Sequence, residues 1–475
     1  MKNGFIKEVM KGWYIPARPE EPTGERTAWY ASFWGFCADY LNSRFGDKWC
    51  LYPEQSLSIH SGNWSIPSQL LVRTPKGGNK PVSLLYETSL LTVRLELPDK
   101  PKLVRIDDLQ VMTLPAALIA CNPGFYLSNS TDIRVALSMI PDASDVLHLL
   151  LQGGHSTVAG RLAGAFRNIG REAVANNIVE SMEAAGYDII EKDPFEEKPI
   201  YSFGGGERSP YVNRVQMAWG EMRGVVLDNF PPPAGLQDEE AYLRLVDDAY
   251  LTDAYHSLSI EGYRVSEALI ERVGSGNWDP EMNQTDKRSG DALAARGYWQ
   301  SFQEVKASLK KVLRSDSPGK VAQNDHSAWY RELFAPSVAA GLLEPADLAG
   351  YRNIPVYIRN SKHVPPRYEA VRDLMPAFFS LLKDEKEPAV RAVLGHFFFV
   401  YIHPYSDGNG RIGRLLMNIM LASGGYPWTI VPFETRNEYM AALEEASAGK
   451  NIGPFSQFIA ALVRQGMNKT DHRKK

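Results

Sequence analysis

The stretch HPYSDGNGRIGR, residues 403–414, decides how this chain folds around its candidate site. The apolar run before it, residues 389–402, predicts a buried helix that ends at Pro404, because proline lacks a backbone donor and restricts the residue before it. The DGNG sequence, residues 407–410, predicts a turn, since glycine and asparagine tolerate positive φ. A second helix is expected over residues 411–422. The sequence therefore predicts two helices joined by a glycine-rich turn.

The groups in this turn suit the binding of phosphate. A glycine-rich turn that opens a helix directs backbone N–H groups at an anion, which is the role expected of Gly408, Asn409 and Gly410. Arg411 and Arg414 lie three residues apart and therefore share a helix face. Their planar guanidinium groups match the geometry of phosphate oxygens.

Two further residues supply a metal ligand and a base. Asp407 is placed to hold Mg²⁺, a hard cation that favours carboxylate and phosphate oxygens. His403 has an ordinary pKa near neutrality, which suits a general base. Taken singly, a histidine before proline, a DGNG turn or an arginine pair is usually structural. Their combination in this order predicts a nucleotide site.

The run 403–414 resembles the motif of the Fic family, H-P-F-x-[DE]-G-N-G-R-x-x-R, with Tyr405 in place of phenylalanine. The resemblance implies an enzyme that transfers AMP from ATP, with Mg²⁺, to a Ser, Thr or Tyr hydroxyl of a protein. It implies that His403 is the base and that Asn409 contacts the α-phosphate. Arg411 and Arg414 would hold the β- and γ-phosphates.

A second motif lies upstream. The sequence SLSIEG, residues 257–262, resembles the inhibitory motif [ST]-x-x-x-E-[GN] of Fic proteins. Ser257 and Glu261 are four residues apart and share a helix face. The resemblance implies that Glu261, followed by Gly262, pairs with Arg414 and so blocks the γ-phosphate site. The alternative is an ordinary exposed glutamate before a helix-ending glycine.

The resemblance covers about residues 238–463 and predicts a mainly α-helical Fic domain with a β-hairpin flap over residues 238–467. The flap is expected at residues 351–366, where two short β-prone runs surround a polar turn. It would hold an extended target segment by backbone hydrogen bonds. Tyr439 is a candidate wall of the adenine pocket, and its alternative place is the core.

The remaining chain predicts a multidomain protein. Residues 1–200 are expected to form a mixed α/β domain, with strand-like runs at 69–73 and 91–97. The opening GFIKEVMKGWYIP resembles the wing of abortive-infection-type winged-helix antitoxins, and an arginine-rich helix is expected near residues 159–173. This domain could therefore be a partial winged helix or a protein-interaction module. Residues 201–237 are expected to form a linker, and residues 468–475 a disordered tail.

Composition indicates an ordinary globular enzyme. The 475 residues carry a formal net charge of −4, which gives no global attraction to nucleic acid or anionic membrane. Three cysteines without CxxC spacing argue against a disulfide framework or a zinc site. No secretory signal or membrane span is visible, so a cytoplasmic location is expected.

Rival functions remain open. Within the enzyme class, Glu261 could orient a water that removes AMP, or another nucleotide could be the donor. From a different class, the chain could be a nucleotide-sensing regulator whose first 200 residues bind DNA. The target protein and homo-oligomerisation are left open.

Overall fold

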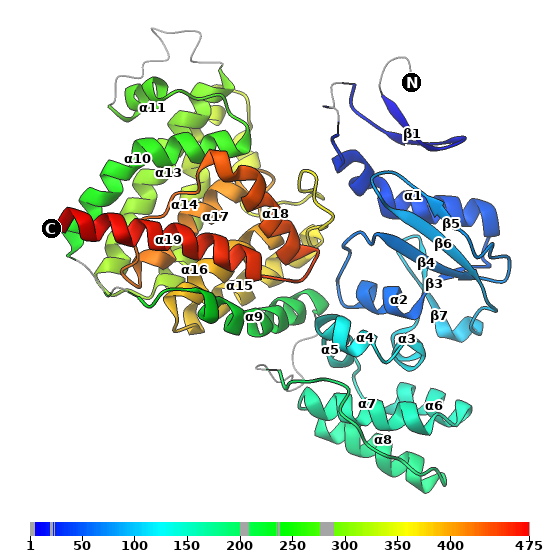
Figure 1. The fold of residues 1–475 in the computed structure, drawn as a ribbon. Helices are drawn as coiled ribbons and strands as arrows, with labels where there is room; N and C mark the ends of the chain where they lie inside the picture. Colours follow the sequence, from blue (N-terminus) through cyan, green and yellow to red (C-terminus); the bar gives the residue numbers. More distant parts are fainter. Residues whose placement is uncertain are drawn as a thin grey trace. The chain divides into compact units, whose positions relative to one another are not determined.

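The computed structural model describes residues 5–19, 22, 24–199, 209–233, 235, 238–275 and 289–474, with side chains of the last helix described to residue 468. The chain divides into two compact units, each treated by itself below (Figure 1). The N-terminal unit comprises Met1–Glu221 and Val356–Pro366. The C-terminal unit comprises Met222–Pro355 and Arg367–Lys475.

The strands described by the structure lie in three small sheets of the N-terminal unit. The central sheet has the order β3-β4-β6-β5, in which β4 and β6 are parallel and the other pairs antiparallel. In β4 the alternate residues Leu70, Val72 and Thr74 are buried, as expected of a strand with one face on the core. The strand prediction near 69–73 is confirmed, and that near 91–97 is confirmed with a start two residues and an end three residues earlier. The bounds are β1 Ile6–Met10, β2 Trp13–Pro16, β3 Cys50–Leu51, β4 Gln69–Thr74, β5 Pro81–Ser83, β6 Ser89–Arg94, β7 Leu103–Ile106 and β8 Leu109–Met112.

Helices surround two hydrophobic cores in this unit. One core joins the aromatic face of α1, including Trp29 and Phe33, to Leu70 and Val72 of β4. The other joins the helices after β8. All three cysteines are buried and free. The bounds are α1 Thr27–Phe45, α2 Pro53–His60, η1 Lys100–Lys102, α3 Leu114–Ala120, α4 Phe125–Ser128, α5 Ser130–Ser138, α6 Ser144–Gly153, α7 Ser156–Asn168 and α8 Glu172–Ala184.

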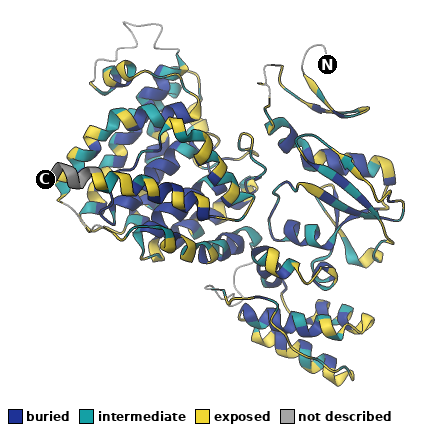
Figure 2. Ribbon diagram, in the orientation of Figure 1, coloured by how far each residue is buried: buried dark blue, intermediate teal, exposed yellow. Residues whose placement is uncertain are grey.

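The C-terminal unit is a bundle of helices built around α16 and α17, which are buried along almost their whole length (Figure 2). Helix α17 contacts α10, α13, α14 and α16. The close packing of α16 on α17 needs Gly413, since a Cβ there would lie 2.7 Å from Nδ1 of His396. The bounds are α10 Glu239–Glu261, α11 Glu267–Gly274, α13 Gly290–Leu313, α14 Pro318–Ala339, η2 Pro345–Leu348, α15 Tyr368–Asp384, α16 Pro388–Ile402, α17 Asn409–Ala422, η3 Phe433–Thr435, α18 Arg436–Ser447 and α19 Gly453–Lys474.

The predicted β-hairpin at residues 351–366 is wrong. This stretch contains a turn, in which Ser361 N donates to Ile358 O at 3.1 Å, but no strand. Three prolines within it lack backbone donors, and some of its other backbone groups bond outside it: Arg352 N donates to Pro404 O and Lys362 O accepts from Ile66 N. The two arms therefore do not pair with each other.

Two other expectations need correction. The segment expected as linker contains helix α9 (Pro210–Asn229), which spans the point where the chain passes from one unit to the other. The expected disordered tail is helical to Lys474, because α19 continues through it without a break. Residues 201–208 of the linker lie outside the described residues. Among the described helices, none combines the length and apolar character needed to cross a membrane.

Candidate active site

His403 stands at the end of α16 in a left-handed backbone conformation, with φ of 53°. The helix ends where Pro404 predicts. The Nδ1 atom of His403 lies 2.9 Å from the carbonyl oxygen of Val400. Because a carbonyl oxygen can only accept, Nδ1 carries the proton in the neutral ring. The Nε2 atom is thereby left as the basic nitrogen.

The electrostatic surroundings keep this imidazole neutral. Burial lowers the pKa of His403, and the positive charge of Arg352 lowers it further. Arg352 Nε donates to the carbonyl oxygen of His403 at 2.7 Å, and its backbone N donates to Pro404 O at 2.9 Å. Sequence reasoning missed Arg352, since nothing in its local pattern ties it to a histidine 51 positions later.

The pH dependence of catalysis should reveal this environment. A base works only when unprotonated, so a lowered pKa keeps His403 active below the ordinary value of 6.5. We expect the acid limb of kcat/KM to lie below pH 6.5, and to move lower still in Glu261→Gly because the Glu261 charge raises the pKa of His403. Rates of the catalysed reaction measured from about pH 5 to 8 test this. An acid limb at or above pH 6.5 would contradict it.

Gly408 opens α17 in a left-handed conformation with φ of 79°. A Cβ there would lie 2.8 Å from the ring of Phe334, so both backbone and space require glycine. Asn409 closes the turn, because its Oδ1 accepts from Tyr405 N at 2.9 Å and its Nδ2 donates to Tyr405 O at 2.8 Å. The Asn409 side chain, expected at an α-phosphate, is thus 1% exposed and engaged with the backbone.

Both arginines of the motif are buried. Arg411 lies between the rings of Tyr263 and Phe334, at 5.2 and 5.1 Å from their centroids, and its Nη2 is 3.4 Å from Asp407 Oδ2. Two buried guanidinium atoms, Arg411 Nε and Arg414 Nη1, have no hydrogen-bond partner among the described residues. Buried donors of this kind require an acceptor, and phosphate oxygens supply several. The arrangement therefore fits a polyphosphate.

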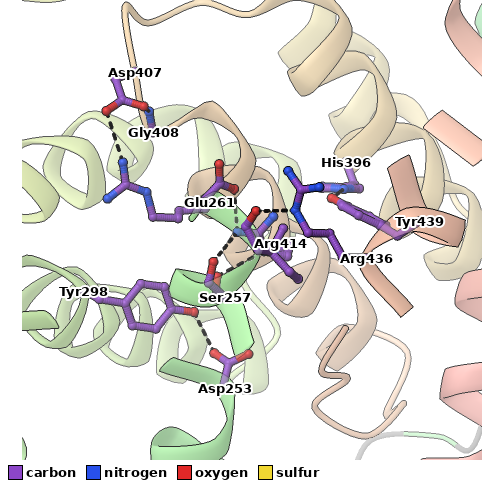
Figure 3. A network of polar contacts seen from close by, with 12 residues as sticks. Asp253, Ser257, Glu261, Tyr298, His396, Asp407, Gly408, Arg414, Arg436 and Tyr439 are labelled. Carbon is purple, nitrogen blue, oxygen red and sulfur yellow. Dashed lines mark hydrogen bonds and ion pairs between the residues drawn. The ribbon is translucent and has the colours of Figure 1, made fainter. Parts of the chain in front are cut away.

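The C-terminal end of α10 meets Arg414. Arg414 Nη2 donates to Glu261 Oε1 at 2.7 Å and to Ser257 O at 3.0 Å, and its Nε donates to Ser257 Oγ at 3.0 Å (Figure 3). Gly262 then ends α10 with φ of 97°. The Glu261 carboxylate lies against Gly410, where any Cβ would collide with its Oε1. The glutamate thus occupies space directly at the glycine-rich turn.

The Glu261–Arg414 contact is an ion pair of two charged groups. Burial opposes ionisation of Glu261, but the charges of Arg414 and Arg411 outweigh this cost and lower its pKa. Burial likewise opposes the charge on Arg414, and Glu261 restores it. The Arg414 side chain is 5% exposed and that of Glu261 is 26% exposed. Removing one partner would leave the other charged and poorly solvated.

Other contacts fix the C-terminal end of α10, and sequence reasoning missed them. Tyr298 Oη donates to Asp253 Oδ2 at 2.8 Å, and Arg436 Nε donates to Ile260 O at 2.7 Å (Figure 3). Burial raises the pKa of Asp253 to about 6. The spacing of Asp253, four residues before Ser257, was a usable signal because it places both on one helix face. Tyr298 and Arg436 carried no such signal.

Tyr439 lies in the core. It is 1% exposed, its Oη is 2.7 Å from His396 Nε2, and its ring packs near that of Phe455. Figure 3 shows it beside His396 on the far side of Arg414 from Asp407. The structure therefore gives Tyr439 a packing role, in line with the alternative weighed for it, and no exposed face for adenine.

Asp407 is suitably placed for a cation. Its side chain is 65% exposed, and its Oδ1 accepts from Gly408 N at 2.6 Å. Among the described residues no group of three or more His, Cys, Asp or Glu side chains could hold a metal ion. A single carboxylate agrees with Mg²⁺, which is commonly held by one or two carboxylates, substrate phosphates and water.

The helix expected near 159–173 is interrupted, because α7 ends at Asn168 and α8 begins at Glu172. Arg167 pairs with Glu191 at 2.7 Å and also with Glu172, while Arg171 donates to Ile140 O at 2.7 Å. A charge neutralised within the unit, as that of Arg167 is, contributes little to phosphate binding. These contacts weaken the case for DNA binding through this helix.

The structure thus brings together His403, Asp407, Gly408, Gly410, Arg411, Arg414, Ser257 and Glu261, while Tyr439 is buried against His396. This combination can hold the phosphates of a nucleotide beside a neutral imidazole.

Comparisons with known proteins agree with this geometry. Residues 323–421 match the model of the Fic/DOC family. The chain is 31% identical over 226 residues to Protein adenylyltransferase Fic of Nematostella vectensis, covering 47% of this chain and 49% of that protein. It is 28% identical over 235 residues to Protein adenylyltransferase fic-1 of Caenorhabditis elegans, covering 47% and 42%. The C-terminal half therefore contains a Fic domain related to Fic protein adenylyltransferases.

The chain spans about half the length, or less, of these curated relatives. A solved structure of a C. elegans Fic-1 fragment has 19% identity and a TM-score of 0.40, and the match covers 70% of this chain and 92% of that one.

Proposed function

We propose that this protein is an autoinhibited protein adenylyltransferase, which transfers AMP from ATP to a Ser, Thr or Tyr hydroxyl of a target protein. The observation that carries the proposal is the bonding of Arg414 to Glu261 and Ser257 at the glycine-rich turn beside His403. An arginine with an unmet donor next to an anion-binding helix terminus suits a triphosphate. A glutamate bound to that arginine would prevent the same arginine from binding the triphosphate.

Binding is assigned to the groups of the turn. The backbone N–H of Gly410 and the guanidinium groups of Arg411 and Arg414 hold the phosphates. Asp407 would hold Mg²⁺, which supplies positive charge to the phosphate oxygens and orients the leaving group. Positioning and charge stabilisation are the main catalytic contributions of such a site.

The chemical step then requires one base. His403 Nε2 accepts the proton of the target hydroxyl, and the oxygen forms a bond to the α-phosphorus. The bond from that phosphorus to the oxygen bridging the α- and β-phosphates breaks, and pyrophosphate leaves with the electron pair. The product is a phosphodiester that joins AMP to the target side chain.

The choice of transferred group can be tested directly. The Glu261→Gly variant is incubated with Mg²⁺, a cell lysate, and ATP labelled on either the α- or the γ-phosphate. We expect label on protein from α-labelled ATP alone, because the β- and γ-phosphates leave as pyrophosphate. Label from γ-labelled ATP would instead show kinase chemistry. If labelled ATP gives no labelled protein but another labelled nucleotide does, then that nucleotide is the donor.

Removal of AMP is the second candidate, and one observation favours it. The ionised Glu261 carboxylate is partly exposed at the turn, so it could orient a water towards the phosphorus of an AMP already on a target. Loss of AMP release from a modified target on Glu261→Gly, together with no gain of transfer, would favour this reading.

A further inference from the structure

A line of polar side chains on one face of α10 leads from Arg414 to a buried carboxylate. Asp253, Ser257 and Glu261 are spaced four residues apart, so they follow one another along the same helix face. Glu261 and Ser257 contact Arg414 directly, at 2.7 and 3.0 Å. Asp253 lies one turn before Ser257 and is 5% exposed (Figure 3). The contact between α10 and Arg414 therefore has a second carboxylate behind it.

Tyr298 of α13 connects this second carboxylate to Ser257. Tyr298 is fully buried, and its Oη donates to Asp253 Oδ2 at 2.8 Å. A side-chain hydrogen bond also joins Tyr298 to Ser257. Because the Tyr298 hydroxyl gives its one proton to Asp253, Ser257 is the donor in that bond. Ser257 Oγ in turn accepts from Arg414 Nε at 3.0 Å. The hydrogen bonds thus run in one direction, from the guanidinium of Arg414 to the carboxylate of Asp253.

The direction of this chain of hydrogen bonds depends on the charge of Asp253. An ionised carboxylate can only accept, so it fixes Tyr298 as a donor and leaves Ser257 Oγ as the acceptor that faces Arg414. A protonated or amide side chain at position 253 can donate to Tyr298 instead, and the two hydroxyl groups are then free to turn. A turned Ser257 hydroxyl points its proton at Arg414 Nε, where two donors cannot bond. The anion at the far end therefore sets how well Ser257 holds the arginine.

Asp253 is ionised at neutral pH although it is buried. Burial raises its pKa to about 6, and the bond from Tyr298 and the positive charge of Arg414 oppose a larger rise. Among the described residues, the titratable groups that interact with it are Tyr298 of α13, Arg414 of α17 and, on its own helix, Tyr250. Arg414 is the cation of this set, so a buried anion and a buried cation stabilise each other across Ser257.

We propose that Asp253 and Tyr298 are positioning residues, which hold Ser257 and Arg414 in the blocked arrangement through this directed chain of hydrogen bonds. The inference rests on the proposed adenylyltransferase function and describes the regulation of the same site. All of its residues belong to the C-terminal unit. ATP must then compete with two carboxylates for Arg414, of which one binds the arginine directly and the other acts through Ser257.

Replacement of Asp253 by asparagine in the otherwise native chain tests the proposal. The change keeps the size of the side chain and removes its charge, so AMP transfer from limiting α-labelled ATP should rise roughly three- to tenfold. The Kd for ATP with Mg²⁺ should fall by a similar factor. In the Glu261→Gly background the same change should have no further effect, because the blocked arrangement is already absent. Asp248→Asn, at an exposed position of the same helix, is the matched control and should leave both quantities unchanged.

A second variant removes the middle of the chain of hydrogen bonds instead of its end. Tyr298→Phe lacks only the hydroxyl oxygen, and it should raise transfer and ATP affinity as Asp253→Asn does. The double variant should equal the stronger of the two single variants, because both changes break the same chain. Additive gains would show that the two residues act independently and would overturn the chain. Unchanged transfer and ATP affinity in both single variants would overturn the positioning role.

Melting temperatures supply a readout that needs no activity. The raised pKa of Asp253 means that its ionisation costs free energy in the folded state, so stability present at low pH is lost as the pH rises through about 6. Asp253→Asn does not bear this cost. Its melting temperature should therefore gain roughly 2 to 4 °C on that of the native chain between about pH 5 and pH 7.5. A difference that is the same at both pH values would overturn Asp253 as the ionised end of the chain.

These measurements distinguish failure of this inference from failure of the proposed function. If Glu261→Gly transfers no label from ATP, the adenylyltransferase function is refuted, and the two ATP affinities still decide whether Asp253 and Tyr298 hold Arg414. If Glu261→Gly is active while neither variant changes transfer or ATP affinity, the function stands and the chain of hydrogen bonds has no part in its regulation.

Discussion

Replacing Glu261 with glycine is expected to raise AMP transfer by about 10- to 100-fold, because it frees Arg414 for the γ-phosphate. Arg414 makes its charged contact at 2.7 Å to Glu261. A charge-assisted hydrogen bond of this kind contributes about 1.5 to 3 kcal/mol, which must be given up before the arginine can bind ATP. The measurement is the initial rate of label transfer from α-labelled ATP at saturating nucleotide.

Two further variants make this result specific to the Glu261 charge. Glu261→Gln keeps the size of the side chain without its charge, so it should activate partially. Glu240→Gly removes an 81% exposed glutamate from the same helix and should leave the rate unchanged. ATP should also raise the melting temperature of Glu261→Gly more than that of the native chain, since the buried Arg414 charge regains a partner. Equal rates for the native chain and Glu261→Gly would exclude autoinhibition by this residue.

Replacing His403 with alanine in the Glu261→Gly background should lower transfer by about 100- to 10,000-fold, the usual contribution of a positioned base. The Nδ1 bond to Val400 O directs Nε2 as the basic nitrogen, and burial keeps the ring neutral. The proposed nucleotide contacts come from Arg411, Arg414 and the glycine-rich turn. ATP binding should therefore be retained while the chemical step is lost.

Single-turnover transfer and equilibrium ATP binding, measured on the same preparation, separate these effects. His148→Ala is a suitable control, because His148 is exposed in the N-terminal unit and its ring contacts Gln152. It should leave both quantities unchanged. Full transfer by His403→Ala, with ATP binding intact, would remove His403 from the mechanism and leave solvent as the proton acceptor.

The local geometry of the site was predictable because its determinants are close in sequence. Pro404 ends α16 and Gly408 opens α17, and both act within one or two residues of themselves. The spacing of Ser257 and Glu261 on α10 likewise follows from the helical period alone. These features need only backbone preferences and a repeat of 3.6 residues.

Contacts between distant residues were decided by the tertiary structure. The β-prone arms of 351–366 do not pair because α1 and Ser65–Ser68 of the N-terminal unit provide partners for the tip and returning arm. Tyr439 was a candidate wall of the adenine pocket with the core as its alternative, and packing around His396 buries it. Arg352 reaches His403 only because the fold brings the two together. Local sequence carries no record of such pairings, since many partners satisfy the same hydrogen-bonding group equally well.

By itself, then, the sequence determined the helix–turn–helix segment of residues 388–422, the candidate base and the two arginines. Only the tertiary structure decided which groups those side chains contact. It brought Glu261 onto Arg414 and tied residues 356–366 to the N-terminal unit. The physical reason is that backbone conformation depends on neighbours along the chain, whereas the partner of a buried charge depends on which surfaces pack to exclude water.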